Sequence, residues 1–275
     1  MSVKIAIQGI KGSNHHQVAR EYCSVDAELI ECMSFDYLVD RLLDGSADKG
    51  IMAIENSIAG SIIPNYALVH DNNLHIIGEH YLNIHHNLMV LKGQTIEDIV
   101  EVRSHPMALL QCKDFFRKYP NIRLVEDVDT AETAKQIQDK QLKGIGAIAP
   151  KVAAELYDLN IIASDIQTIK NNATRFIIVK TKNKELPKEE INKASVRFIT
   201  DHKRGSLATV MNVMSDCYLN LTKIQSLPII EKPWKYAFFV DVKFDDYAHF
   251  EKAKSLLNIM LDDFKILGEY KNAML

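Results

Sequence analysis

The sequence lacks any apolar run approaching the roughly 20 residues that a helix needs to cross a bilayer. It also lacks an excess of one charge, because 33 Lys and Arg face 36 Asp and Glu, for a formal net charge of -3. We therefore expect neither a nucleic-acid partner nor a membrane partner. Met1 leads into an apolar stretch instead of a signal peptide, which predicts a cytoplasmic protein.

Metal-binding and disulfide patterns are absent too. No C-x-x-C pair occurs, so we expect reduced and mostly buried thiols at Cys23, Cys32, Cys112 and Cys217. The ten histidines include no H-x-x-x-H or H-E-x-x-H spacing. His85 and His86 are neighbours, which point to opposite faces of a strand, and His105 before a proline is more simply a structural residue. The sequence therefore predicts no metal site.

Strand and helix patterns alternate through the first 160 residues. Predicted strands lie at 3–7, 28–31, 50–55, 99–103, 122–125 and 145–149, and predicted helices at 18–22, 34–43, 107–117, 130–139 and 151–157. This order is typical of an α/β fold with a mostly parallel sheet, in which ligands bind beyond the carboxyl ends of the strands. A long extended section, 74–92, predicts a crossing from one lobe to another.

Polar side chains gather at several of these strand ends. The loop Gly9–Asn14 can offer backbone amides to an anion, but it lacks the third glycine of a dinucleotide site, so we reject a Rossmann cofactor. Glu55–Ser57 follows the apolar run 50–54, and Asn172–Arg175 precedes the apolar run 176–179. A hydroxyl beside a guanidinium suits a small oxyanion. An arginine at a strand end is otherwise a solvated or ion-paired residue.

The remainder of the chain restarts after a charged stretch, 181–190, that is typical of a linker. Predicted strands at 194–200, 219–227, 236–244 and 264–270 and helices at 206–217 and 247–261 follow in the order βαββαβ. This order predicts a ferredoxin-like unit, and such small sheets commonly pair across a dimer.

Several separated motifs occur together and in order. They are Gly9–Ser13, Ile54–Ser57 with Gly60, Ser104–Pro106 with Gln111 and Cys112, Asn172–Phe176, Gly205–Ala208, Ser226 with Pro228, and Pro233 with Trp234. Through them nearly the whole chain resembles the prephenate dehydratase family with an appended ACT regulatory domain. No single motif decides this, but their joint occurrence in order does.

The resemblance implies a two-lobed catalytic domain at 1–180, similar to periplasmic binding proteins, with its second lobe at about 80–160 and the substrate between the lobes. A linker at 181–193 and an ACT domain at 194–275 would follow. The implied reaction is the decarboxylating dehydration of prephenate to phenylpyruvate, on the way to phenylalanine, with no metal or organic cofactor. Phenylalanine would inhibit by binding at the ACT interface of a homodimer or homotetramer.

Family roles carry over onto matching residues. Thr174 is the expected donor to the leaving hydroxyl, Arg175 the partner of the pyruvyl carboxylate, and Glu55 either an acid or a group that orients its neighbours. The expected substrate-binding residues are Ser13, Asn56, Ser57, Ser104, Gln111, Asn172 and Phe176. The expected phenylalanine-binding residues are Gly205, Ser206, Leu207, Ala208, Gln225, Ser226 and Pro228.

The chain departs from the family pattern at several positions. Ile10, His15 and Ala53 replace residues of the two N-terminal motifs, which changes loop stiffness more than chemistry. Gln225 and Leu227 stand where the family has a glutamate and an arginine, so we expect phenylalanine to bind more weakly. Arogenate dehydratase and a non-catalytic amino-acid-responsive binding protein are the alternative functions.

Overall fold

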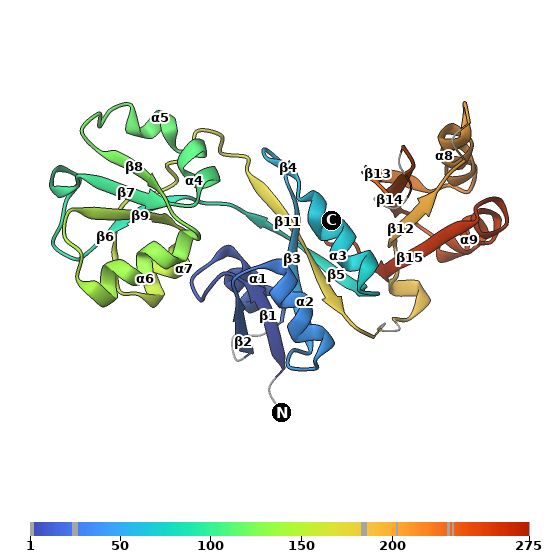
Figure 1. Ribbon diagram of the computed structural model, residues 1–275, viewed down its shortest axis with the longest axis horizontal. Coiled ribbons are helices and arrows are strands. Elements are labelled where there is room, and N and C mark those ends of the chain that lie inside the picture. The colour runs from blue at the N-terminus through green and yellow to red at the C-terminus, as the bar shows by residue number, and fades with distance from the viewer. Residues whose placement is uncertain are drawn as a thin grey trace. The chain divides into compact units, whose positions relative to one another are not determined.

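The computed structural model describes residues 3–23, 27–182, 186–201, 203–229, 232 and 234–274 (Figure 1). Pro233 and the linker residues 183–185 lie outside this part. Two compact units are present, with Met1–Gly60 and Tyr81–Phe176 in unit 1, and Ser61–His80 and Ile177–Leu275 in unit 2. No helix of the described ranges is both long and apolar enough to span a membrane.

The first sheet contains the N-terminal βα repeats. Its strands follow the order β2-β1-β3-β11-β5, and β4 pairs with β3. Their bounds are β1 Lys4–Gln8, β2 Glu28–Cys32, β3 Lys49–Asn56, β4 Gly60–Ser61, β5 His75–Asn83 and β11 Ala173–Lys180. Strand β1 runs parallel to β2 and β3, as expected for strands joined through helices α1 (Asn14–Tyr22) and α2 (Phe35–Leu43). Ser13 and Ser34 cap these helices.

The second sheet has the strand order β10-β6-β9-β7-β8. Its strands are β6 Asn87–Val90, β7 Glu101–Ser104, β8 Arg123–Glu126, β9 Ile145–Ala149 and β10 Asn160–Ala163, with a 3₁₀ turn η1 at Ile96–Asp98. Helices α4 (Pro106–Gln111) and α5 (Lys113–Phe116) cover one face, and α6 (Thr130–Lys140) and α7 (Lys151–Leu156) cover the other (Figure 1). Alternation along β6 supplies both cores, because Leu88 and Val90 face one side and Met89 faces the other.

Two details of the second sheet differ from the sequence prediction. The sheet is mixed, because β6 is antiparallel to both β9 and β10. Strand β6 enters this sheet directly from β5 of the first sheet, through the three residues 84–86, and not through a βα repeat of the second sheet. The helix expected at 107–117 is also interrupted at Cys112, the C-cap of α4 and N-cap of α5.

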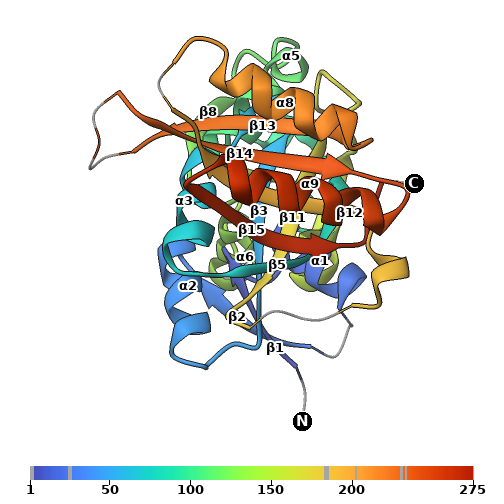
Figure 2. The ribbon, with the colours of Figure 1, turned by 90° about the vertical axis from the view of Figure 1, so that its right-hand side faces the viewer.

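Unit 2 contains the predicted βαββαβ module. Its elements are β12 Lys193–Ile199, α8 Ser206–Asp216, β13 Asn220–Pro228, β14 Tyr236–Lys243, α9 Tyr247–Met260 and β15 Asp263–Tyr270. The strand order is β13-β14-β12-β15, all neighbours are antiparallel, and the ferredoxin-like prediction is confirmed. Helices α8 and α9 lie on one face of this sheet (Figure 2), where Val196, Phe198 and Val240 help form the core. A 3₁₀ turn, η2 at Lys188–Glu190, precedes the module.

The opposite face of that sheet carries buried polar groups. Tyr66 of helix α3 (Ile63–Asp71) stacks edge-on against Phe239. Lys193, 2% exposed, donates to both carboxylate oxygens of Glu79 at 2.9 and 2.8 Å. A Cβ on Gly268 would collide with the backbone oxygen of Ile76, so only glycine allows β15 to approach this segment so closely. Residues 61–80 therefore pack as part of unit 2.

Candidate active site

The polar turn after β3 fixes the orientation of one amide. Asn56 Oδ1 accepts hydrogen bonds from the backbone N–H groups of Ile58 (2.9 Å) and Ala59 (2.8 Å). Its amide nitrogen must therefore face the other way. There Nδ2 donates to Asn172 Oδ1 at 2.7 Å, to Thr174 Oγ1 at 2.9 Å and to the Ala173 carbonyl at 3.3 Å. The ends of β3 and β11 are thus joined through one side chain.

Backbone contacts of Ser57 reinforce this junction. Ser57 N donates to the Ala173 carbonyl at 2.8 Å, and Ala173 N donates to Ser57 Oγ at 3.0 Å. Since β11 begins at Ala173, Thr174 and Arg175 lie inside the strand and not ahead of it. Alternation therefore sends their side chains to opposite faces. Thr174 turns toward Asn56, and Arg175 Nη1 lies 3.7 Å from Glu55 Oε1.

Asn172 extends the network into the second sheet's helices. Its Nδ2 donates to Gln111 Oε1 at 2.9 Å, at the end of α4. The same oxygen lies 2.8 Å from His86 Nε2. Gln111 is also tied down through its carbonyl, which accepts from Thr168 N at 2.9 Å. The structure thus brings together the predicted residues Asn56, Ser57, Gln111, Asn172 and Thr174.

His86 joins this network although the sequence did not single it out as a binding residue. It is buried just ahead of β6, and its backbone N donates to Gln167 Oε1 at 3.0 Å. Burial lowers the pKa of His86, so its ring is neutral near pH 7. Its position at the end of the extended crossing was the only available signal. Metal-ligand spacing gives no sign of this role, because the partner of His86 is the side-chain amide of Gln111 and not a metal ion.

The loop after β1 packs closely on helices α6 and α7. Gly9 has φ +86°, and a Cβ there would collide with the Asp129 carboxylate. Gly12 has φ +96° and lies against Ala131 and Ala153. Both positions therefore require glycine. Asp129 caps α6 through Ala131 N at 2.6 Å, and burial raises its pKa to about 6.

Ser13, Ser104 and Phe176 lie outside the amide network. Ser13 is 2% exposed and accepts from His16 N at 3.3 Å as the N-cap of α1. Ser104 Oγ is fully buried and donates to the Ile148 carbonyl at 2.6 Å. Phe176 packs edge-on against His15 with ring centroids 5.0 Å apart. Burial lowers the pKa of His15 to about 3, so this histidine stays neutral.

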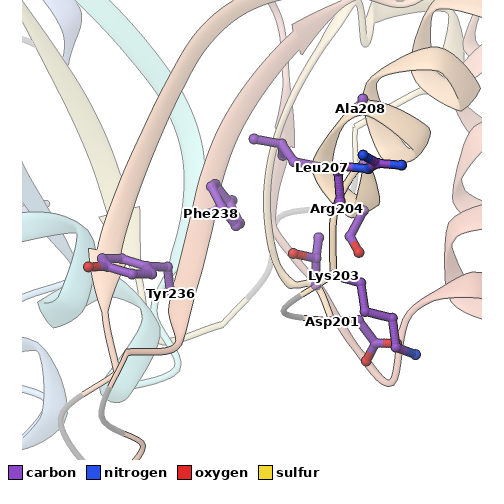
Figure 3. A pocket seen from close by; sticks show the side chains of 10 residues that line it. Asp201, Lys203, Arg204, Leu207, Ala208, Tyr236 and Phe238 are labelled. Atoms are coloured by element: carbon purple, nitrogen blue, oxygen red, sulfur yellow. The ribbon is translucent and has the colours of Figure 1, made fainter.

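A second predicted site, at the N-terminus of α8, contains a cavity of about 570 Å³. Its lining includes Gly205, Ser206, Leu207, Ala208, Tyr236 and Phe238. Leu207 and Ala208 lie on one side of it and Tyr236 and Phe238 on the other (Figure 3). This volume is in the range of small-molecule sites. Gln225, Ser226 and Pro228 do not line the cavity. They lie on β13, where Ser226 pairs in register with Phe238.

Comparisons with known proteins agree with this arrangement. Residues 5–184 match the family described as prephenate dehydratase. "Arogenate dehydratase/prephenate dehydratase 2, chloroplastic" from Arabidopsis thaliana is 34% identical over 281 residues, which cover 98% of this chain and 72% of that protein.

Two solved structures are similar over 98% of the chain. One is the prephenate dehydratase from Arthrobacter aurescens in complex with L-Phe, with a TM-score of 0.86, 25% identity and 90% of that chain covered. The other is GqqA, described as a novel type of quorum quenching acylase, with a TM-score of 0.88, 25% identity and 98% of that chain covered.

Proposed function

The chain belongs to the prephenate dehydratase family and is a carbon–oxygen lyase, and from this premise we propose how its residues convert prephenate to phenylpyruvate. The catalytic part spans residues 1–180, followed by a linker at 181–193 and a regulatory ACT domain at 194–275. The observation that carries the proposal is the amide network around Thr174, in which Asn56 donates to the threonine hydroxyl.

The reaction breaks two bonds of the substrate. The ring carboxylate leaves as CO2, its electron pair enters the ring, and the ring hydroxyl leaves as water after one proton is taken up. Aromatisation supplies the driving force, so the site must chiefly stabilise charge on the leaving oxygen. Thr174 Oγ1 already accepts from Asn56, which leaves its own hydrogen available for that oxygen. Thr174 is therefore the proposed donor.

The remaining groups bind and orient the substrate in this proposal. Arg175 is the proposed guanidinium partner of the pyruvyl carboxylate, and Glu55 is its ion-pair partner in the protein. Because Arg175 lies on the face of β11 opposite Thr174, this assignment requires that the pyruvyl arm extends around the start of the strand. Because Glu55 is already paired with Arg175, we assign the donor role to Thr174 alone. Asn56, Ser57, Gln111 and Asn172 surround the substrate with amides and a hydroxyl, and the buried Ser13, Ser104 and Phe176 support the surrounding loops and strands.

Arogenate is the second candidate substrate, since the name of the 34% identical plant relative includes both activities. Arogenate carries an ammonium where prephenate has a keto oxygen, and its product is phenylalanine. Purified protein should be incubated with each substrate while phenylpyruvate and phenylalanine are followed. Phenylpyruvate from prephenate supports the proposal, and turnover of arogenate alone replaces it. No product from either compound would indicate a non-catalytic binding protein.

Phenylalanine is the proposed regulatory ligand of the 570 Å³ cavity. The aromatic rings of Tyr236 and Phe238 and the backbone amides after Gly205 suit an amino acid with an apolar side chain. The similar Arthrobacter structure contains L-Phe, which supports this choice. Calorimetric titration with phenylalanine should give binding heat, and the absence of heat would contradict the regulatory assignment.

A cytoplasmic homodimer or homotetramer completes the proposal. Strand β13 is an edge of its sheet and exposes Leu221 and Ile224, which suits pairing with a second copy. A second copy could then bring Gln225, Ser226 and Pro228 to the cavity.

A further inference from the structure

The direction of every hydrogen bond in the amide network follows from one backbone turn. The N–H groups of Ile58 and Ala59 can only donate, so they fix Asn56 Oδ1 as the acceptor. Asn56 Nδ2 then faces Asn172, which must present its oxygen. The Asn172 nitrogen in turn faces Gln111, which must present Oε1. None of these three amides can flip without placing like atoms against each other.

This order reaches the imidazole of His86. Gln111 Oε1 has no hydrogen to give, so the contact of 2.8 Å requires that His86 Nε2 carries the proton. The neutral ring therefore adopts the Nε2–H tautomer, which is set by the hydrogen bond and not by a charge. Two donors hold the Gln111 oxygen from separate connections, Asn172 just ahead of β11 and His86 just ahead of β6.

Gln111 Nε2 is the free end of this arrangement. Because both hydrogen bonds use Oε1, the NH2 group points away from them, and no residue of the described ranges accepts from it. The Thr174 hydroxyl also has its hydrogen left to donate, since its oxygen accepts from Asn56. The network thus ends in an amide donor and a hydroxyl donor, which is suited to a substrate rich in oxygen.

We infer that His86 is a positioning residue for the proposed reaction: its Nε2–H bond to Gln111 Oε1 aims the Gln111 NH2 group at an oxygen of the substrate. This inference rests on the proposed function for its substrate and on the geometry of the network for its mechanism. His86 acts through Gln111 and does not itself contact the reacting atoms.

The first test compares two replacements of His86. His86→Phe keeps a flat ring but removes the donor, and we expect kcat/KM to fall about tenfold, as for the loss of one buried hydrogen bond. His86→Gln offers a donor near the Nε2 position and should restore kcat/KM to within about threefold of wild type. A folded His86→Gln enzyme as impaired as His86→Phe would overturn the inference. His85→Gln, at an exposed neighbour paired with Asp165, is the matched control and should leave activity unchanged.

A double-mutant cycle separates action through Gln111 from a direct role. In a Gln111→Met background, His86→Phe should have less than a twofold further effect, because the group it positions is already gone. If the reductions in kcat/KM caused by His86→Phe and Gln111→Met instead multiply in the double variant, His86 acts independently of Gln111, contrary to the inference. Thermal unfolding of each variant identifies any loss of activity that comes from misfolding.

A spectroscopic measurement tests the same inference without any turnover. The ¹⁵N shifts of the imidazole ring distinguish the two neutral tautomers, and the His86 signals are identified by their loss in His86→Gln. We expect the Nε2–H pattern in the wild-type protein. The Nδ1–H pattern would overturn the inference even if the enzyme is active. Wild-type protein inactive on both substrates, but with the Nε2–H pattern, would instead refute the proposed function alone.

Discussion

A hydroxyl group can donate or accept, and at Thr174 a single neighbour decides which. Asn56 Nδ2 occupies the acceptor side of the oxygen, so the hydrogen is left for a ligand. The threonine is 8% exposed, which keeps water from competing strongly for that hydrogen. The environment of Thr174, and not the acidity of threonine, therefore supports its proposed role as donor to a leaving oxygen.

Thr174→Val should reduce kcat by about 10²–10³ while KM changes little, because the lost hydrogen bond strengthens mainly in the transition state. Valine keeps the shape of threonine, so the strand should be preserved. Steady-state kinetics with the preferred substrate measure the effect. Thr174→Ser retains the hydroxyl and should keep most of the activity. Wild-type kcat in Thr174→Val would exclude Thr174 as the donor.

The sequence indicated most residues of the candidate site but could not predict which atoms each of them contacts. Asn56, Asn172 and Thr174 were selected from motifs at strand ends and Gln111 through the family resemblance, and the structure joins them by hydrogen bonds. The sequence could not indicate that Ser104 donates to the backbone carbonyl of Ile148, since the two residues are 44 positions apart. His86 was missed for the same reason, because its partner Gln111 is 25 positions away.

Among the elements, helix α6 has an N-cap residue, Asp129, whose hydrogen bond stabilises the helix while its burial disfavours the charged carboxylate. Asp129 supplies the N-cap acceptor, which normally favours the charged carboxylate. Burial has the larger effect, and nearby Glu132 and Asp127 add repulsion, so the pKa of Asp129 rises to about 6. The carboxyl binds its proton more tightly in the folded state. The stabilisation that comes from protonated Asp129 is therefore fully present below pH 3.8 and is lost as the pH rises through about 6.

Asp129→Asn should accordingly become more stabilising as the pH rises from 4 to 7. Asparagine caps helices as well as aspartate but does not titrate, so the free energy of unfolding relative to wild type should increase by up to about 3 kcal/mol over this range. Urea unfolding at a series of pH values measures the difference. Asp246→Asn, at the exposed N-cap of α9, is the control for replacing an aspartate cap by asparagine outside a buried environment. A constant difference for Asp129→Asn would mean that burial does not govern this carboxyl.

Most elements could be predicted from periodicity and capping residues. Ser34 before an apolar helical pattern marked α2, and the alternating strands of unit 2 gave the ferredoxin-like order. Strand β10 was missed because it is short and pairs irregularly with β6 at the sheet edge. The interruption at Cys112 was missed because it depends on a backbone contact between Gln111 and Thr168, not on local preference.

In the molecule as a whole, a buried ion pair holds distant segments of unit 2 together. Lys193 at the start of β12 and Glu79 on β5 are 114 positions apart, and both are almost fully buried. Glu79 also accepts from the backbone N–H of Ala273 at 3.1 Å. The charged linker suggested a boundary before residue 194. It could not indicate that residues 61–80 pack with the C-terminal part, because such long-range pairs leave no local pattern.

Lys193→Met should destabilise the protein by about 3–5 kcal/mol, because it removes the counter-charge of a buried carboxylate. Equilibrium unfolding in urea measures this loss. Lys193→Met combined with Glu79→Met should recover most of the stability, since the uncompensated charge is then absent. Equal stability of Lys193→Met and wild type would show that the carboxylate is compensated by other groups.

The strand order of the first sheet has a consequence for synthesis of the protein. Strand β11 pairs between β3 and β5, but it leaves the ribosome only after the entire second sheet has been made. Until then, the nascent chain has β3 and β5 with open hydrogen-bonding edges that invite association with other chains. Completion of the N-terminal sheet is thus delayed until late in translation.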